Sequence, residues 1–222
     1  GFAFEGELGL PNLEEVVNFY VDKDVRWSRR HLLVGVPFLV ADPDIGLLVF
    51  EQYAINAKDN WFTRGFARYT WYLYRFVMPL KARFGGVMMF GKGAARESTM
   101  LAMDYFDEDQ PSEDLALSMD VIGRSGGRWY IKYVQIPGVE EGEGVSRRYS
   151  DEIPRQIRFA YGTVKVWLRP VTEWLQHGLF TERFMQFMRA DIAWYQKADL
   201  LRHLVSYPMK MVILTGTSLT LV

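Results

Sequence analysis

The sequence contains few side chains that are typical of catalytic centres. It has three histidines, His31, His177 and His203, and no cysteine. The histidines fall in separate expected elements, and none belongs to a metal-binding helix motif such as H-E-x-x-H. Glu173 lies four residues before His177, a spacing that more often gives a surface ion pair than a site. The lack of cysteine excludes structural disulfides, thiol nucleophiles and cysteine-ligated metal centres.

Three short segments have compositions that could do chemistry, but each has a simpler interpretation. Residues 91–96 are small and basic like a phosphate-binding loop, yet they lack the third glycine of a dinucleotide motif and are too short for a P-loop. The acids of residues 104–109 could hydrolyse a bond or bind a hard cation, but acids in such a loop are usually solvated. Ser125 lies in a glycine-rich turn that does not match the G-x-S-x-G motif. The sequence therefore predicts no catalytic residue, no cofactor and no metal site, although a spatial Ser-His-Asp triad stays open.

The most distinctive segment is residues 61–84, which hold nine aromatic and five basic residues and no acid. At 100° per residue the segment divides into two faces, which predicts an amphipathic helix that kinks or ends near Pro79. One face is apolar: Phe62, Phe66, Tyr69, Leu73, Phe76, Val77 and Leu80. The other face is basic and has aromatic residues beside the arginines. We predict that the interaction residues of the protein are Trp61, Arg64, Arg68, Trp71, Tyr72 and Arg75.

This helix has three competing interpretations. In the simplest, its apolar face fills the core and its arginines are solvated or pair with the acidic segments 107–114 and 140–143. In the second, it lies on a lipid or partner surface, with arginines near phosphates and tryptophan and tyrosine at the boundary. In the third, it binds nucleic acid through arginines and stacked aromatics. The pI of about 6.4 and the acidic flanking segments make nucleic acid an unlikely partner.

The net charge of −1 hides four blocks of alternating sign. Residues 1–59 carry a net charge of −5, residues 60–96 of +7, residues 97–146 of −8 and residues 147–222 of +5. Such blocks either pair inside the fold or present separate faces to partners. No stretch of 18 consecutive apolar residues occurs, so the sequence predicts no ordinary transmembrane helix.

The expected fold class is α+β. Capping signals predict a helix over about residues 12–30, which begins at Asn12 with Glu15, and another over residues 43–57. Residues 41–44 can also be interpreted as a turn, but Asp42 as the cap and Pro43 at the first position favour the helix. Gly35 and Pro37 argue against a regular helix over 32–40. We expect four strands that form an antiparallel β-meander over about residues 86–136, with the N-terminal helices packed on one face. These strands cover residues 87–90, 99–106, 115–122 and 128–136, and a hairpin at residues 123–127 joins the last two.

Beyond a glycine- and glutamate-rich loop at residues 137–146, the chain turns helical again. We expect a short helix from Ser150, another over residues 170–177 and a long one over 181–206 that Pro208 ends. Residues 211–222 predict an extended apolar arm. This gives a core domain over residues 1–136 and a helical C-terminal region with the arm over residues 147–222, unless the two form one continuous domain.

These features together favour a non-catalytic accessory subunit of a larger, membrane-associated protein complex. It would dock through the basic aromatic helix and the apolar arm, with other protein subunits and anionic lipid headgroups as partners. A start at Gly1 rather than Met fits the loss of a targeting segment, for example in a mitochondrial complex, and equally a cut chain. The alternative is a small-molecule-binding or enzymatic α+β domain with a pocket between helices and a curved sheet.

Overall fold

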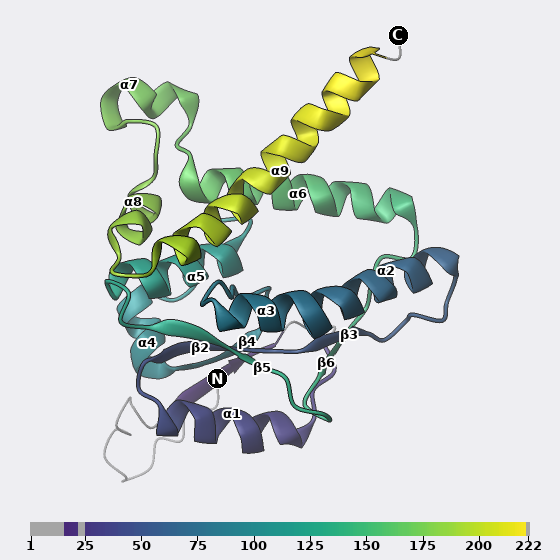
Figure 1. Ribbon diagram of the computed structural model, residues 1–222, viewed down its shortest axis with the longest axis vertical. Helices are drawn as coiled ribbons and strands as arrows, with labels where there is room; N and C mark the ends of the chain where they lie inside the picture. Colours follow the sequence, from purple (N-terminus) through teal and green to yellow (C-terminus); the bar gives the residue numbers. More distant parts are fainter. Residues whose placement is uncertain (1–15, 22–24, 221–222) are drawn as a thin grey trace.

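The computed structural model describes residues 16–21 and 25–220, and only the backbone of 207–208 and 210–220. Its centre is a small β-sheet that lies between two layers of helices (Figure 1). Helix α1, Arg29–Ala41, covers one face of the sheet. The other face carries the remaining long helices, of which α2 and α3 lie nearest to the sheet and α6 and α9 lie farthest from it.

The sheet is mixed in direction. Its order is β1-β4-β2-β5, with bounds Val17–Tyr20, Gly93–Arg96, Ile45–Phe50 and Tyr130–Val134. Strand β4 is antiparallel to both of its neighbours, whereas β2 and β5 are parallel. A second, two-stranded parallel sheet pairs β3, Gln52–Ala54, with β6, Glu141–Glu143. Since β3 follows β2 after one residue, the small sheet continues from the edge where β2 and β5 end.

Strand β2 explains why two helical layers are needed. All six of its residues are buried, and alternate side chains point to opposite faces of a strand. Leu48 and Phe50 pack into the smaller core under α1, while Leu47 and Val49 pack into the larger core on the other side. A strand that is buried on both faces reads as a continuous apolar run rather than an alternating one.

The helices of the other layer differ in how much of their surface is buried. Helix α2, Trp61–Tyr72, runs through a π-helical turn, η1, Leu73–Val77, into α3, Met78–Arg83. Helix α5, Glu113–Arg124, is central, and all of residues 115–122 are buried. The others are α4 (Glu97–Met103), α6 (Tyr149–Trp167), η2 (Val171–Glu173), α7 (Trp174–His177), α8 (Glu182–Arg189) and α9 (Trp194–Thr220).

The predicted helix over residues 61–84 is confirmed. Asn60 begins it, because its side-chain oxygen accepts a hydrogen bond from the Thr63 N–H at 2.9 Å and the Thr63 hydroxyl accepts one from the Asn60 N–H at 3.0 Å. Pro79 does not end the helix, since the chain continues to Arg83. The wider π-helical turn comes directly before the proline, where the regular α-helical hydrogen bonds would be interrupted.

The antiparallel meander is wrong, so the α+β fold class holds only as a mixed arrangement of helices and a small sheet. Of the four predicted strands, only the last contains a strand of this sheet, β5. Residues 99–106 begin within α4, residues 115–122 lie inside α5, and residues 87–90 have no regular secondary structure. Helix α5 was misread because a helix that is buried all round has no polar face to reveal its period.

Two of the N-terminal expectations are also wrong. The expected helix over residues 12–30 contains β1, although residues 12–15 lie outside the described part. The expected helix over residues 43–57 contains β2 and β3. Conversely α1 is helical through Pro37, and its Gly35 packs closely on the sheet side, where a Cβ would lie 3.0 Å from the Phe19 ring. In each case burial against the sheet outweighed local sequence signals.

The C-terminal region is helical, as expected, but its elements differ. Two helices, α8 and α9, replace the single helix predicted over residues 181–206. The backbone of α9 passes Pro208 and includes residues 211–220, so the extended arm is wrong as far as the structure describes it; residues 221–222 lie outside. None of the helices in the described ranges is long and apolar enough to cross a membrane.

Candidate active site

The candidate site lies where the parallel strands β2 and β5 end. In open α/β sheets, ligands bind in the crevice outside the carboxyl ends of the parallel strands. Strand β2 ends at Phe50, and Glu51 and Gln52 follow it directly. Strand β4 runs the opposite way, so its first residue, Gly93, and the preceding Lys92 come to the same edge. The topology therefore collects polar residues from distant parts of the chain at one place.

Strand β6 adds two glutamates to this edge. Glu141 is fully buried, and Glu143 binds the buried Lys92 ammonium at 2.5 Å. Arg155 of α6 lies 3.9 Å from Glu143 on its other side. Burial raises the pKa of Glu141 to about 8, and the nearby Glu143 adds to this rise while Lys92 opposes it. A glutamate with such a pKa is mostly protonated at neutral pH.

Asp114 in the first turn of α5 provides a second perturbed carboxyl. Burial raises its pKa to about 6, although the backbone N–H groups of Leu115, at 2.8 Å, and Gly91 donate hydrogen bonds to it and oppose the rise. The Ser118 hydroxyl donates to the Asp114 carbonyl at 2.8 Å and accepts a bond from the Met89 N–H at 2.9 Å. These bonds fix the start of α5 against residues 89–91, just before Lys92.

Tyr74 shows that these groups share one region. Its side chain projects from the π-helical turn and is buried. Burial raises the pKa of its hydroxyl well above the usual value, and Glu143, Glu141, Tyr133 and Asp114 raise it further in that order. Because Coulomb interactions weaken with distance, these groups all lie near the Tyr74 side chain. We call Tyr74, Lys92, Asp114, Glu141 and Glu143 the polar cluster.

The structure also places the predicted interaction residues. Trp61, Trp71 and Tyr72 are exposed by 82, 55 and 56 % of their surface, and Arg64 and Arg68 are exposed as well. These five residues lie on the outside of α2. Arg75 differs from the others, because its guanidinium donates two hydrogen bonds of 2.8 Å to the carboxylate of the buried Glu51 at the edge of the candidate site.

The expected separation of α2 and α3 into apolar and basic faces is wrong in part. Tyr69, Phe76 and Leu80, expected in the core, are exposed by more than half of their surface. Thr63 and Lys81, which are polar, are buried instead. Lys81 reaches Asp199 of α9 at 2.5 Å, and Tyr74 reaches the polar cluster. Because polar groups take part of the inner face, aromatic and aliphatic side chains remain on the outside.

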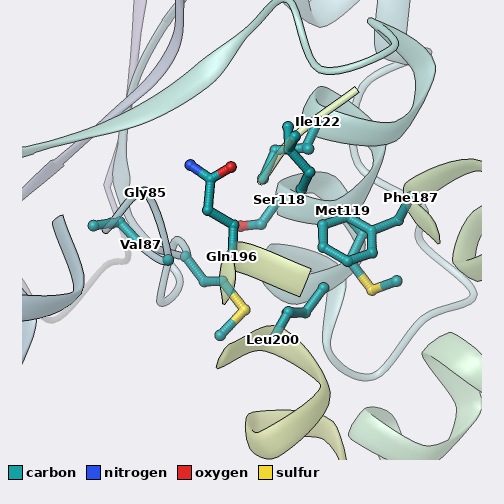
Figure 2. Close-up of a pocket in the computed structure, with 11 residues that line it drawn as sticks. Gly85, Val87, Ser118, Met119, Ile122, Phe187, Gln196 and Leu200 are labelled. Carbon is teal, nitrogen blue, oxygen red and sulfur yellow. The ribbon is translucent and has the colours of Figure 1, made fainter. Parts of the chain in front are cut away.

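The cavity in Figure 2 is not the candidate site. It is lined mainly by apolar side chains, among them Met119, Phe187 and Leu200, and lies between α5, α8 and α9 (Figure 2). Its volume is about 10 Å³. This is space for about one water molecule, and far too little for a small-molecule substrate. The perturbed carboxyls of the polar cluster lie elsewhere, so the chemistry is assigned to the cluster.

The part of the chain that the structure describes contains no preformed metal-binding site. There, no three histidine or acidic side chains come together in a way that could hold one. The buried histidine, His31, is a packing residue, since its ring stacks on Trp27 at 4.7 Å and burial lowers its pKa. In the sequence Asp22 and Asp24 follow β1, but they lie outside the described residues.

Comparison with known proteins supplies the family. The family model described as "Glycosyl transferase family group 2" matches residues 19–222. The chain belongs to this family. A search of curated proteins found no match. Among solved structures, a mannosyltransferase from Pyrobaculum calidifontis in complex with GDP-Man and Mn²⁺ shares 16 % identity at a TM-score of 0.44, covering 93 % of this chain. The chain spans 56 % of that protein's length.

Family membership corrects the expected function. A glycosyl transferase family is a family of enzymes, so the non-catalytic accessory subunit is wrong, and the enzymatic alternative is better supported. Asp114 was not predicted as a site residue because the sequence there favours an acidic loop followed by a strand. Glu141 and Glu143 were not predicted because they lie in a segment whose composition is typical of a glycine-rich loop. Two glutamates two residues apart share one face of a strand, and this spacing was the available signal.

Proposed function

We propose that this chain transfers a sugar from an activated donor to a hydroxyl group of an acceptor, with Asp114 as the general base. The observation that carries the proposal is a pKa of about 6 for a carboxyl of the polar cluster, near the carboxyl ends of the parallel strands. Family membership supplies the reaction class. The perturbed pKa of Asp114 supports this residue as the general base, because catalytic acids and bases often have perturbed pKa values.

The reaction needs a base because the acceptor hydroxyl is a weak nucleophile. As its oxygen forms a bond to the anomeric carbon of the donor sugar, the bond from that carbon to the leaving oxygen breaks and the leaving group takes the electron pair. The hydroxyl proton passes to the Asp114 carboxylate. General bases work best when their pKa lies near the operating pH, and such a base contributes about 10²–10⁴-fold in rate. A carboxyl of pKa about 6 is ionised at neutral pH yet more basic than an ordinary aspartate.

Two cations of the site can stabilise a negatively charged leaving group such as a phosphate. Lys92 is buried and Arg155 is half-buried, and both lie beside Glu143. Positive charge that is held in place before the reaction stabilises charge developing on the leaving oxygen.

Two further expectations stand as proposals beside this function. We propose that the mixed sheet with its two helical layers is a glycosyltransferase-like fold, and that its division near residues 136–147 follows the predicted domains. The exposed Trp61, Trp71 and Tyr72, with Arg64 and Arg68, could contact anionic lipid headgroups or other protein subunits. Supporting this, aromatic rings beside arginines suit the boundary between lipid and water.

Replacing the base tests the proposed function. Purified protein is incubated with UDP-glucose, UDP-N-acetylglucosamine and GDP-mannose in turn, and sugar transfer to lipid extract or to water is followed by release of the nucleoside diphosphate. We expect wild-type turnover of at least one donor and a loss of about 10²–10⁴-fold in Asp114→Asn, which removes the base and keeps the shape. Asp151→Asn, an exposed aspartate in the first turn of α6, is the matched control and should retain activity. Equal rates in wild type and Asp114→Asn would remove Asp114 from the mechanism.

A further inference from the structure

Glu141 of the polar cluster and the neighbouring Gln52 are buried, and each has side-chain polar atoms without a hydrogen-bond partner among the described residues. Glu141 is fully buried, and neither of its carboxyl oxygens has a hydrogen-bond partner among the residues that the structure describes. Gln52 is only 5 % exposed, and its side-chain nitrogen likewise has none. Leaving such a group unpaired in the interior costs about 1–3 kcal/mol, so native proteins rarely keep one without a reason.

The two side chains lie side by side. Gln52 of β3 and Glu141 of β6 are register partners in the parallel pair, and the Glu141 N–H donates to the Glu51 carbonyl at 2.7 Å, which fixes that register. Side chains alternate along a strand, so Glu141 points to the same face as Glu143, which binds Lys92. The opposite face of β6 is occupied, because a Cβ on Gly142 would lie 2.8 Å from the Tyr53 hydroxyl. Both unpaired groups therefore face the polar cluster.

We propose that Gln52 and Glu141 form a subsite that binds hydroxyl groups of a sugar ring. The proposal rests on the proposed function, since it places this subsite beside Asp114 in the same site. Burial keeps Glu141 protonated at neutral pH, so it offers one O–H donor and one carbonyl acceptor, and Gln52 offers N–H donors. A hydroxyl both donates and accepts hydrogen bonds, so it can satisfy donor and acceptor atoms together.

Charged ligands fit this subsite less well. The Lys92 ammonium and the Glu143 carboxylate form an ion pair and act on Glu141 with opposite sign, so the surroundings of the subsite favour neither an anion nor a cation. A neutral polyhydroxylated ring carries neither charge, and its hydroxyls would supply the hydrogen-bond partners that both side chains lack. The hydroxyls belong either to the donor sugar or to an acceptor sugar, because their chemistry is the same.

The test compares variants that keep or remove the hydrogen bonds. Glu141→Gln keeps a neutral group of similar shape that can donate and accept, whereas Glu141→Leu and Gln52→Leu remove the bonds. Glu140→Gln changes the neighbouring glutamate, whose carboxylate accepts a bond from the Gly138 N–H, and serves as the matched control. Binding is measured by thermal shift with glucose, mannose and N-acetylglucosamine, each titrated up to solubility. Turnover is measured with the donors named above.

We expect at least one of these sugars to stabilise wild type, Glu141→Gln and Glu140→Gln. The apparent affinity should fall about tenfold in Glu141→Leu and in Gln52→Leu, the effect of a lost hydrogen bond with a partner left unpaired. A raised KM for the nucleotide sugar, seen also when water is the acceptor, assigns the subsite to the donor. A raised KM for the lipid-extract acceptor alone assigns it to the acceptor.

The subsite and the proposed function can fail separately. If wild type turns over a donor and both leucine variants match its sugar affinity and KM, the subsite is overturned and the transferase stands. It is equally overturned if none of the three sugars stabilises wild type. If sugars stabilise wild type but not the leucine variants, and no donor is turned over, the subsite stands and the transfer proposal fails for these donors.

Discussion

The buried carboxyl of Glu141 should make the stability of the folded protein depend on pH in a predictable direction. Burial raises the pKa of Glu141 from 4.5 to about 8. The folded state therefore holds a proton that the unfolded state has released, and the free energy of unfolding falls as the pH rises between these two values. Below about pH 4.5 both states are protonated, so this group contributes no pH dependence there.

The size of the effect follows from the same two pKa values. Each pKa unit corresponds to about 1.4 kcal/mol, so at pH 7 the ionisable Glu141 lowers the free energy of unfolding by about 3 kcal/mol relative to a group that does not titrate. Between pH 6 and pH 8 the loss grows by about 2 kcal/mol. Asp114 adds little to the pH dependence of stability between pH 6 and pH 8, since its pKa in the folded state is about 6. Glu141→Gln should therefore be more stable than wild type at pH 8, and flatter in its pH dependence.

The assay is urea-induced unfolding of wild type, Glu141→Gln and Glu140→Gln at pH 6, 7 and 8, followed by tryptophan fluorescence. Other titrating groups are common to all three proteins, so the difference between two slopes isolates Glu141. Relative to wild type, Glu141→Gln should gain about 2 kcal/mol between pH 6 and pH 8. For a chain of this length, this corresponds to a gain of about 4–8 °C in melting temperature relative to wild type over the same pH range. Parallel pH dependences for wild type and Glu141→Gln would show that Glu141 is ionised and solvated in the folded protein, and would refute the reasoning.

Three further changes test the packing and the exposed helix. Replacing Arg183 by Met should lower the free energy of unfolding by about 3 kcal/mol, because the buried carboxylate of Asp120 loses its partner at 2.8 Å and keeps only the longer contact with Arg124 at 3.5 Å. An unchanged urea midpoint would contradict this. Gly46→Ala should lower the free energy of unfolding by about 1–3 kcal/mol in the same assay, since the new Cβ would lie 2.4 Å from a methyl group of the buried Val121. An unchanged free energy of unfolding would mean that the sheet and α5 can move apart to make room. Replacing Arg64 and Arg68 by Glu should weaken binding to vesicles that contain phosphatidylserine, measured by flotation, but leave the urea midpoint unchanged. Equal flotation of wild type and variant with these vesicles would exclude the lipid contact.

Local signals in the sequence predicted some elements well. The helix over residues 61–83 was predictable because Asn60 caps it and because its aromatic and basic residues recur at helical spacing. Strand β5 was predictable from its alternation. The π-helical turn and the exposure of Tyr69 and Phe76 were not, since they depend on which residues of the helix face the sheet and the polar cluster.

The candidate site could not be predicted from local sequence patterns. Asp114 and Glu141 come from a helix start and a three-residue strand, 27 positions apart in the sequence. What sets their pKa values is burial, which depends on the parallel pairing of β2 with β5 and of β3 with β6. Parallel strands pair over long separations, and a sequence read as an antiparallel meander puts these residues in solvated loops. Once the topology is known, the edge at which a ligand binds follows from a general rule.

The most direct test of Asp114 as the base is the pH dependence of sugar transfer. We predict that kcat/KM for the preferred donor and acceptor rises with pH through a pKa of about 6 and then levels off, because Asp114 must be deprotonated to accept the proton. In Asp114→Asn the residual rate should lose this inflection. A wild-type profile without a group titrating near pH 6, or the same inflection in Asp114→Asn, would contradict the account.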